Sequence, residues 1–286
     1  MTSLKVSVGS SHRRKPVSRF RRDLDSGFRR NDGIKKSDPA RRLCHSNCNF
    51  QASVDPRPSV IEERLKKVKR IIAVTGWKGG IGKSVIACAL ALLLAKKGYK
   101  TGLFDLDFAG ASDHIILGAG GLFPKEEKGL EPPLFEGVKF MSVVFFSENK
   151  AVPLRGANVS DAIIELLAIT QWGELDFLVL DMPPGINDAA LDVLRFAGKA
   201  EVLAVTTPSV IARDVLARSL VLYRGLKAPV LGVLENMARG PAPKGIAARL
   251  RFDPGLEAAL GHPAALIKTA FCRDLISALK ILKLEE

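Results

Sequence analysis

From residue 70 onward, short runs of apolar residues alternate with longer segments whose apolar residues recur at helical spacing. Strands that alternate with helices are the pattern of βαβ units, so the sequence predicts an α/β fold: a three-layer, doubly wound, mostly parallel sheet. The predicted strands are 71–75, 101–105, 139–145, 177–180, 202–205 and 231–234. The predicted helices are 83–97, 160–171, 188–196, 211–226 and 273–282, with exposed loops at 118–137 and 238–245.

The first 60 residues lack this periodicity and are rich in Arg, Ser, Asp and Pro. We therefore predict a basic, disordered tail over 1–60 and one folded domain over 61–286. Residues 60–69 predict a short charged helix that leads into the domain. The repeated Phe-Arg-Arg character of the tail is typical of translated bacterial repeat DNA, which would place the native start further along the chain. A transit peptide is a weaker alternative, because such peptides are poor in acidic residues.

The charge is concentrated in this tail. Of a net charge of +13, residues 1–70 contribute 19 Lys or Arg against 7 Asp or Glu, and the remainder is nearly neutral. A nearly neutral folded part argues against a nucleic-acid groove on the domain. The tail itself suits either a solvated charge run or a contact with nucleic acid or anionic lipid.

The cysteines and the apolar runs indicate where the protein resides. The chain has four cysteines, Cys44, Cys48, Cys88 and Cys272. Because no apolar segment of the sequence resembles a signal peptide, a disulfide framework is not expected. The longest apolar run, residues 85–95, is shorter than the roughly 18 residues that span a bilayer. We therefore expect a soluble, cytoplasmic protein.

A glycine-rich segment lies between the first predicted strand and the first predicted helix. It reads Trp-Lys-Gly-Gly-Ile-Gly-Lys-Ser over residues 77–84, and strand, glycine-rich turn, Lys-Ser and helix together predict a phosphate-binding P-loop. Glycines let backbone N–H groups turn toward phosphate oxygens, the lysine can reach the β- and γ-phosphates, and the serine hydroxyl can bind Mg²⁺. The candidate nucleotide-binding residues are Gly79, Gly80, Ile81, Gly82, Lys83, Ser84 and Val85.

One position departs from the strict P-loop pattern. Trp77 occupies the place of the first glycine, and Lys78 follows it inside the loop. A lysine at this place marks a deviant P-loop, in which the first position is less strict. The alternative is a glycine-rich turn that carries two solvated lysines.

Carboxylates follow two other predicted strands. Asp105 and Asp107 end the second strand, and Asp181 ends an apolar strand in the manner of a Walker-B motif. We expect Asp105 and Asp181 to lie near Mg²⁺ together with Ser84, and Asp107 to orient the attacking water. The alternative for Asp107 is a loop cap. Gly185, after a Pro-Pro pair, is positioned to offer its N–H to the γ-phosphate.

These motifs make the chain resemble the Mrp/ApbC branch of the MinD/ParA-type deviant-Walker P-loop ATPases, over about residues 70–284. The resemblance rests on the P-loop, on Asp-Leu-Asp-Phe-Ala-Gly-Ala-Ser at 105–112, and on Asp-Met-Pro-Pro-Gly at 181–185. Trp-Gly-Glu-Leu-Asp at 172–176 and Glu-Asn-Met at 235–237 favour the Mrp branch.

The resemblance implies an ATP- and Mg²⁺-dependent homodimer that hydrolyses ATP slowly and carries iron–sulfur clusters to client apo-proteins. Lys78 would then reach the phosphates of the partner protomer, much as an arginine finger does, so Lys78, Asp107 and Lys83 are the catalytic candidates. Asn236 would contact the adenine.

The family usually has a Cys-x-x-Cys pair soon after Glu-Asn-Met, and this chain reads Ala-Arg-Gly-Pro-Ala-Pro-Lys over 238–244 instead. An iron–sulfur cluster is therefore uncertain. Cys44 and Cys48 form a Cys-x-x-x-Cys pair in the tail that suits either a metal or cluster site or two free thiols. Cys88 and Cys272 fit packing positions.

Three functions follow from these patterns. The first is an Mrp-like ATPase in iron–sulfur assembly or a derived role. The second is a MinD/ParA-like positioning or partitioning ATPase that binds membrane or DNA in its ATP-bound form. Its support is residues 267–283, which suit a basic amphipathic membrane helix or, alternatively, a helix packed on the sheet. The third is a scaffold that binds nucleotide without hydrolysing it.

Overall fold

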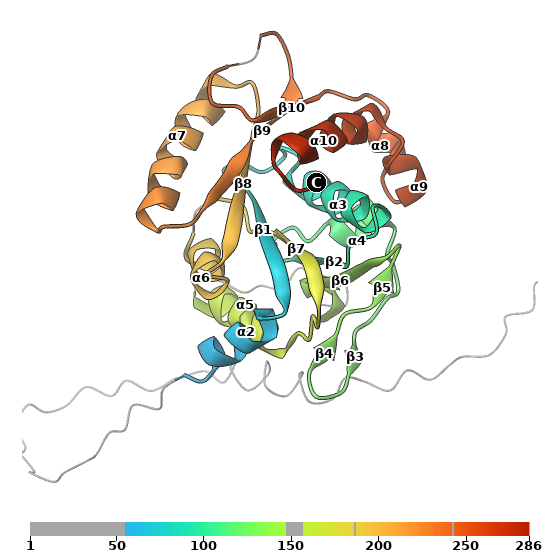
Figure 1. The fold of residues 1–286 in the computed structure, drawn as a ribbon, viewed down its shortest axis with the longest axis vertical. Helices are drawn as coiled ribbons and strands as arrows, with labels where there is room; N and C mark the ends of the chain where they lie inside the picture. The colour runs from blue at the N-terminus through green and yellow to red at the C-terminus, as the bar shows by residue number, and fades with distance from the viewer. Residues whose placement is uncertain (1–54, 147–156, 186, 242, 286) are drawn as a thin grey trace, which may run out of the picture. The chain divides into compact units, whose positions relative to one another are not determined.

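The chain builds an eight-stranded sheet in the order β10-β9-β8-β1-β7-β2-β6-β5 (Figure 1). The computed structural model describes residues 55–146, 157–185, 187–241 and 243–285. Every neighbouring pair of strands is parallel except β5–β6, which is antiparallel. The mostly parallel sheet confirms the predicted α/β class. The strands are β1 (Val68–Gly76), β2 (Thr101–Asp105), β5 (Leu134–Phe135), β6 (Val138–Ser142), β7 (Leu175–Asp181), β8 (Ala200–Thr206), β9 (Val230–Ala238) and β10 (Ala248–Arg251).

All six predicted strands lie in this sheet; β9 extends four residues beyond its predicted end, to Ala238, and β6 is shorter than predicted. The prediction extended this strand to residue 145, whereas it ends at Ser142 and continues as the 3₁₀ helix η1 (Val143–Phe146). The Ser142 hydroxyl accepts a hydrogen bond from Val144 N at 3.2 Å, which turns the backbone away from the ladder.

The predicted exposed loop at 118–137 is wrong in part. It contains a small antiparallel pair, β3 (Lys125–Glu126) and β4 (Leu130–Glu131), and the short edge strand β5. Strands of two residues have no alternation that sequence reading can detect. The strand β10 was missed for a similar reason, since its four residues include two exposed or half-buried arginines.

Helices cover both faces of the sheet (Figure 1). One face carries α3 (Lys83–Lys96), α4 (Asp113–Leu117), α8 (Leu256–Ala259), α9 (Pro263–Leu266) and α10 (Ala270–Ile281), and the other carries α2 (Arg57–Leu65), α5 (Ala157–Ile169), α6 (Asp188–Phe196) and α7 (Val210–Gly225). The helix α3 contacts β1, β7, β2 and β6, and ten of its residues are buried. It is therefore a core helix, as its run of Ala and Leu predicts.

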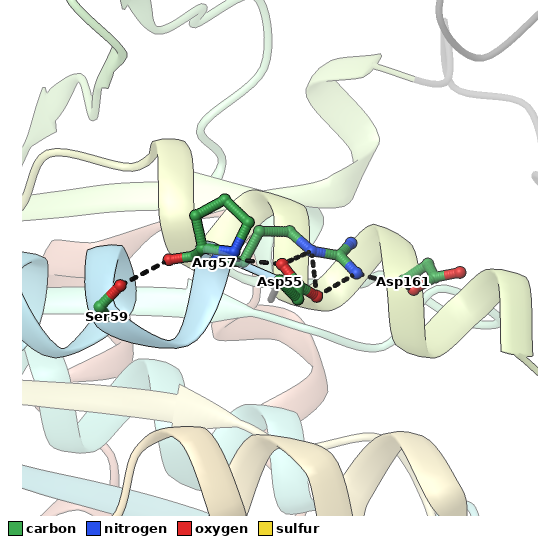
Figure 2. Close-up of polar contacts among 5 residues, drawn as sticks. Asp55, Arg57, Ser59 and Asp161 are labelled. Atoms are coloured by element: carbon green, nitrogen blue, oxygen red, sulfur yellow. Dashed lines mark hydrogen bonds and ion pairs between the residues drawn. The ribbon is translucent and has the colours of Figure 1, made fainter. Parts of the chain in front are cut away.

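The helix α2 begins inside the range predicted as a tail and ends earlier than predicted. It starts at Arg57 and ends at Leu65, and β1 already begins at Val68. The Arg57 guanidinium pairs with Asp55 at 2.7 Å and reaches Asp161 of α5 at 3.3 Å (Figure 2). These exposed ion pairs join the start of α2 to α5, and each contributes little to stability.

The C-terminal helix α10 belongs to the core. Its apolar face, with Phe271, Leu275 and Leu279, is buried against α3 and β10. The Thr269 hydroxyl accepts a hydrogen bond from Cys272 N and so caps the first turn. The packed-helix alternative is therefore confirmed, and the apolar face is not available to a membrane. In the described part of the chain, no helix has both the length and the hydropathy to cross a bilayer.

Candidate functional site

Three strands end at the carboxyl edge of the sheet where the predicted motifs lie. Asp105, the last residue of β2, is the direct register partner of Asp181, the last residue of β7, and both side chains are buried. Next to them, β1 ends at Gly76 and leads into the P-loop. Strand order alone thus brings the two predicted carboxylates beside the phosphate loop, at the edge where ligands of parallel sheets bind.

The glycines of the loop fulfil a steric requirement. Gly82 caps α3 with φ of 83°, and a Cβ there would lie 2.3 Å from Asn236 Nδ2. Gly80 also has a positive φ, 75°, with open space around it. Lys78, Gly79 and Gly80 are exposed, whereas the Ile81 side chain is buried. The loop therefore presents its backbone to the surroundings and anchors itself through Ile81, which is the arrangement a phosphate cradle needs.

Lys83 occupies the first turn of α3 and points into the site. Its Nζ lies 2.6 Å from Asp181 Oδ1, and both side chains are buried. Burial, the largest single cause, lowers the pKa of Lys83, but Asp181, together with the charges of Asp107 and Asp113, outweighs it and the net pKa is raised. The ammonium is therefore charged in the site. Ser84 and Val85 follow on the same turn, half-buried, and the Ser84 hydroxyl is near enough to Asp181 to lower the pKa of that acid.

A third buried acid, Asp113 at the start of α4, joins the two predicted ones. One oxygen from each of Asp105, Asp113 and Asp181 lies within 4.8 Å of the others. Both carboxylate oxygens of Asp113, and Oδ2 of Asp181, are buried without a hydrogen-bond partner. Sequence reading missed Asp113. The available signal was its position directly after the 105–112 motif, but only the return of α4 against α3 places it in the site.

The cluster disfavours its own ionisation. Burial, and then the charge of Asp181, raise the pKa of Asp105 to about 7. The same two causes, in that order, raise the pKa of Asp113 well above its usual value. Burial also raises the pKa of Asp181 despite the opposing effect of Lys83. Buried carboxylates in this arrangement are stabilised by a proton or a cation. Since carboxylate and hydroxyl oxygens are the ligands of Mg²⁺, and three of these oxygens lack a partner, the residues fit Mg²⁺.

The structure places Asp107 as a turn residue at the rim of the site. The strand stops at Asp105, as predicted, and Asp107 is half-buried. Its Oδ1 accepts hydrogen bonds from Ala109 N at 3.1 Å and Gly110 N at 3.0 Å. Oδ1 of Asp107 therefore caps the loop, as the alternative prediction for this residue states. The role in orienting water stays a prediction.

Two residues have protein partners in place of the expected nucleotide contacts. Asn236 is buried, its Nδ2 donates to Ile81 O at 2.8 Å, and its Oδ1 accepts from Met237 N. Gly185 N donates to Gly76 O at 3.0 Å. In this conformation both residues therefore buttress the phosphate loop, and their proposed contacts with adenine and γ-phosphate stay predictions.

The segment after β9 differs in chemistry from the P-loop edge. Glu235 is buried and pairs with Arg249 of β10 at 2.8 Å, and the same guanidinium donates to Gly240 O at 2.9 Å and Arg239 O at 3.0 Å. An arginine thus ties this segment to the sheet, and the segment has none of the cysteines that the resemblance implied.

The cysteines of the described residues are poor ligand candidates. Cys88 and Cys272 are fully buried. Burial raises the pKa of Cys88 well above its usual value and that of Cys272 to about 11, so neither forms a thiolate readily. Cys44 and Cys48 lie outside the described residues.

Comparisons with known proteins agree with this geometry. Residues 67–259 match the family model described as ParA, NUBPL iron-transfer P-loop NTPase. An iron–sulfur cluster carrier protein of Pseudomonas fragi is 40% identical over 178 residues, which are 61% of this chain and 62% of that protein. The chloroplastic Fe-S cluster assembly factor HCF101 of Oryza sativa subsp. japonica is 38% identical over 196 residues, which are 66% of this chain and 37% of that protein. The chain thus spans less than two thirds of the length of these relatives.

Solved structures share the fold. A nucleotide-binding protein in complex with ADP from Archaeoglobus fulgidus is 30% identical with a TM-score of 0.61, and the match covers 73% of this chain and 92% of that one. The septum site-determining protein MinD with Mg-ADP from Pyrococcus horikoshii OT3 has a TM-score of 0.58, with 75% and 96% covered. At 20% identity, the likeness to MinD shows the fold alone.

Proposed function

Because the chain belongs to the ParA family of NUBPL-type iron-transfer P-loop NTPases, we propose that it binds and hydrolyses ATP with Mg²⁺ and acts in iron–sulfur cluster carriage or assembly. This membership confirms the resemblance that the motifs indicated. The observation that carries the proposed chemistry is the buried Lys83–Asp181 pair at the base of a glycine loop, beside the partnerless carboxylate oxygens of Asp113.

The phosphates of ATP would lie along the backbone of residues 78–84. Loop N–H groups and the N-terminus of α3 favour negative charge, and the Lys83 ammonium supplies a buried positive charge. Phosphate oxygens would share this ammonium with Asp181. Ser84, Asp105 and Asp181 would hold Mg²⁺, which neutralises charge that develops on the phosphates.

Hydrolysis would need a positioned water and an added positive charge. The backbone N–H groups of Ala109 and Gly110 both donate to Oδ1 of Asp107. Its Oδ2 is therefore left to orient water at the rim of the site. The exposed side chain of Lys78 suits a reach toward the phosphates of a second protomer, so turnover would depend on a homodimer. This dependence would make hydrolysis by the free monomer slow.

The iron–sulfur role would operate without the usual cysteine pair. With Cys88 and Cys272 buried, Cys44 and Cys48 are the thiols left to bind a cluster. If these two cysteines bind no cluster, the chain would have a derived role in iron–sulfur assembly. It would then use ATP-driven conformational change to act on another iron–sulfur protein, with a client apo-protein as its partner.

The test combines two measurements on the full chain. Anaerobic purification and reconstitution, followed by iron and sulfide analysis, measures cluster binding, and the Cys44→Ser/Cys48→Ser double variant is the control. ATP turnover is measured in parallel with the Lys83→Ala variant as its control. No turnover by the wild-type protein would overturn the ATPase proposal. Turnover with no bound iron would reject carriage by this chain and retain the assembly role.

A further inference from the structure

We propose that Asp113 is a direct ligand of the divalent cation, and that Asp105, Asp113 and Asp181 together bind this cation without nucleotide. In P-loop NTPases the magnesium is usually held by one or two protein oxygens and by the phosphates themselves. A third carboxylate changes that balance, because the protein then supplies most of the ligand charge. The proposal uses the location of the proposed nucleotide site and does not depend on hydrolysis.

The first argument is the unmet bonding capacity of the cluster. Asp113 is 0% exposed, and neither of its side-chain oxygens has a hydrogen-bond partner of normal geometry; the nearby Cys88 thiol, a weak donor, acts to lower the pKa of Asp113 against the larger effect of burial. A buried carboxylate without partners costs several kcal/mol in a folded protein and needs a compensating interaction. Asp181 Oδ2 is likewise buried without a hydrogen-bond partner, although Oδ1 of the same carboxylate pairs with Lys83. Partnerless oxygens thus come from two different elements, α4 and β7, whose acids belong to one cluster.

The second argument is geometric. One ligand oxygen from each of the three acids lies within 4.8 Å of the others, close enough for a single ion to contact all three after small adjustments. Asp105 is held in place by Ser142 Oγ, which donates to its Oδ2 at 3.0 Å, and by Asp107 N, which donates to its Oδ1 at 3.2 Å. Each of these oxygens keeps a second lone pair for a metal.

The third argument is charge. Among the described residues, the ammonium that acts on the cluster is that of Lys83, so three ionised carboxylates would exceed it by two negative charges, and Asp107 at the rim would add to this excess. A divalent cation offsets the two negative charges of the cluster itself. Oxygen-only ligands favour Mg²⁺, Ca²⁺ or Mn²⁺ over softer metals, which defines the class of ion. The competing explanation is that protons shared among the acids neutralise the cluster.

Mn²⁺ distinguishes these explanations, because its free and bound forms have different electron paramagnetic resonance signals. The full-length protein, stripped with EDTA and free of nucleotide, is titrated with Mn²⁺ alone. We expect one ion per chain, displaced by excess Mg²⁺. Asp113→Asn should weaken Mn²⁺ affinity by about tenfold or more. Asp214→Asn, an exposed aspartate on α7 that pairs with Arg218, should bind Mn²⁺ like the wild type.

Thermal unfolding gives a second readout that does not use the resonance signal. Mn²⁺ should raise the melting temperature of the wild-type protein, and the rise should shrink in Asp113→Asn. In EDTA, Asp113→Asn should melt at or above the wild-type temperature, because the amide removes a repulsive charge. No nucleotide-free Mn²⁺ binding by the wild type, or equal binding by Asp113→Asn, would overturn the proposal in favour of shared protons. Either result would leave ATP binding and turnover, measured separately, intact.

Discussion

Two segments at the carboxyl edge of the sheet have opposite chemistry. At the P-loop edge, Asp105, Asp113 and Asp181 are buried with Lys83, and several of their oxygens have no protein partner. At the β9–β10 edge, Glu235 is equally buried, but Arg249 satisfies its charge and also holds the following segment through two backbone carbonyls. Polar groups at the first edge lack protein partners, so this edge suits a ligand. At the second edge the buried carboxylate is paired with an arginine, and the segment carries no cysteine.

This difference indicates that the two edges depend on different partners. The phosphate loop has two lysines, its glycines and buried acids beside it, and several oxygens of these acids lack protein partners. The segment after Glu-Asn-Met has an arginine anchor and none of the cysteines that the resemblance implied. The predictions below test whether the two edges are as independent as their contacts indicate.

The earliest step affected is nucleotide binding, and its largest loss is expected for Lys83→Ala. The triphosphate loses its buried positive partner, so ATP affinity should fall by about 100-fold or more, which corresponds to about 3 kcal/mol. Isothermal titration with ATP and Mg²⁺ measures the loss. Circular dichroism checks that the variant is folded, and Lys244→Ala, in the segment after β9, is the charge-matched control. Unchanged ATP affinity in Lys83→Ala would contradict the assignment of the P-loop edge as the nucleotide-binding site.

For Lys78→Ala, ATP binding should persist while turnover falls by about 10³-fold, in the range of a lost arginine finger. The physical reason is that, in the proposed homodimer, the exposed ammonium would act on the partner's phosphates in the transition state. Single-turnover hydrolysis as a function of protein concentration measures the effect. Wild-type turnover should rise with concentration as dimers form, and unchanged turnover in the variant would refute this role.

Asp107→Ala should lower ATP turnover by about 10²-fold, with ATP still bound, because it removes the carboxylate that we propose orients the attacking water. The loss of the two turn bonds at Oδ1 is a structural effect of the same change. Asp107→Asn keeps an oxygen for those bonds and separates the two effects. If Asp107→Asn hydrolyses ATP like the wild type, the residue is a loop cap and nothing more.

At the second edge, Arg249→Ala should lower the free energy of unfolding by about 3 kcal/mol, because it leaves Glu235 buried and unpaired. Chemical denaturation measures the change. The double variant Glu235→Gln/Arg249→Met should recover most of the loss, since it removes both charges. ATP affinity of the folded Arg249→Ala protein should stay within about threefold of wild type if the edges are independent.

The smallest effect is expected for Asn236→Ala, which removes the hydrogen bond from Nδ2 to Ile81 O and should cost about 1 kcal/mol in unfolding free energy. Comparing ATP with GTP affinity tests the predicted adenine contact. A residue that only buttresses the loop would weaken both nucleotides equally, whereas a base-reading residue would change their ratio.

The sequence was sufficient for most of the fold and for part of the site. Alternating apolar runs predicted six strands and the core helices, because burial on two faces produces continuous apolar segments. The P-loop and the acids at 105 and 181 were found because each follows a strand directly. The short strands β3, β4, β5 and β10 were missed, since runs of two to four residues hold no detectable period.

What the sequence determined by itself was local: which segments become strands, where glycine is required, and which family the motifs resemble. Tertiary structure decided the partners. Lys83 meets Asp181 because β7 lies next to β1, and Asp113 enters the cluster because α4 packs on α3. Asn236 and Gly185 bond to the loop for the same reason. Local propensity acts over a few residues, whereas these contacts join positions that strand order and helix packing bring together.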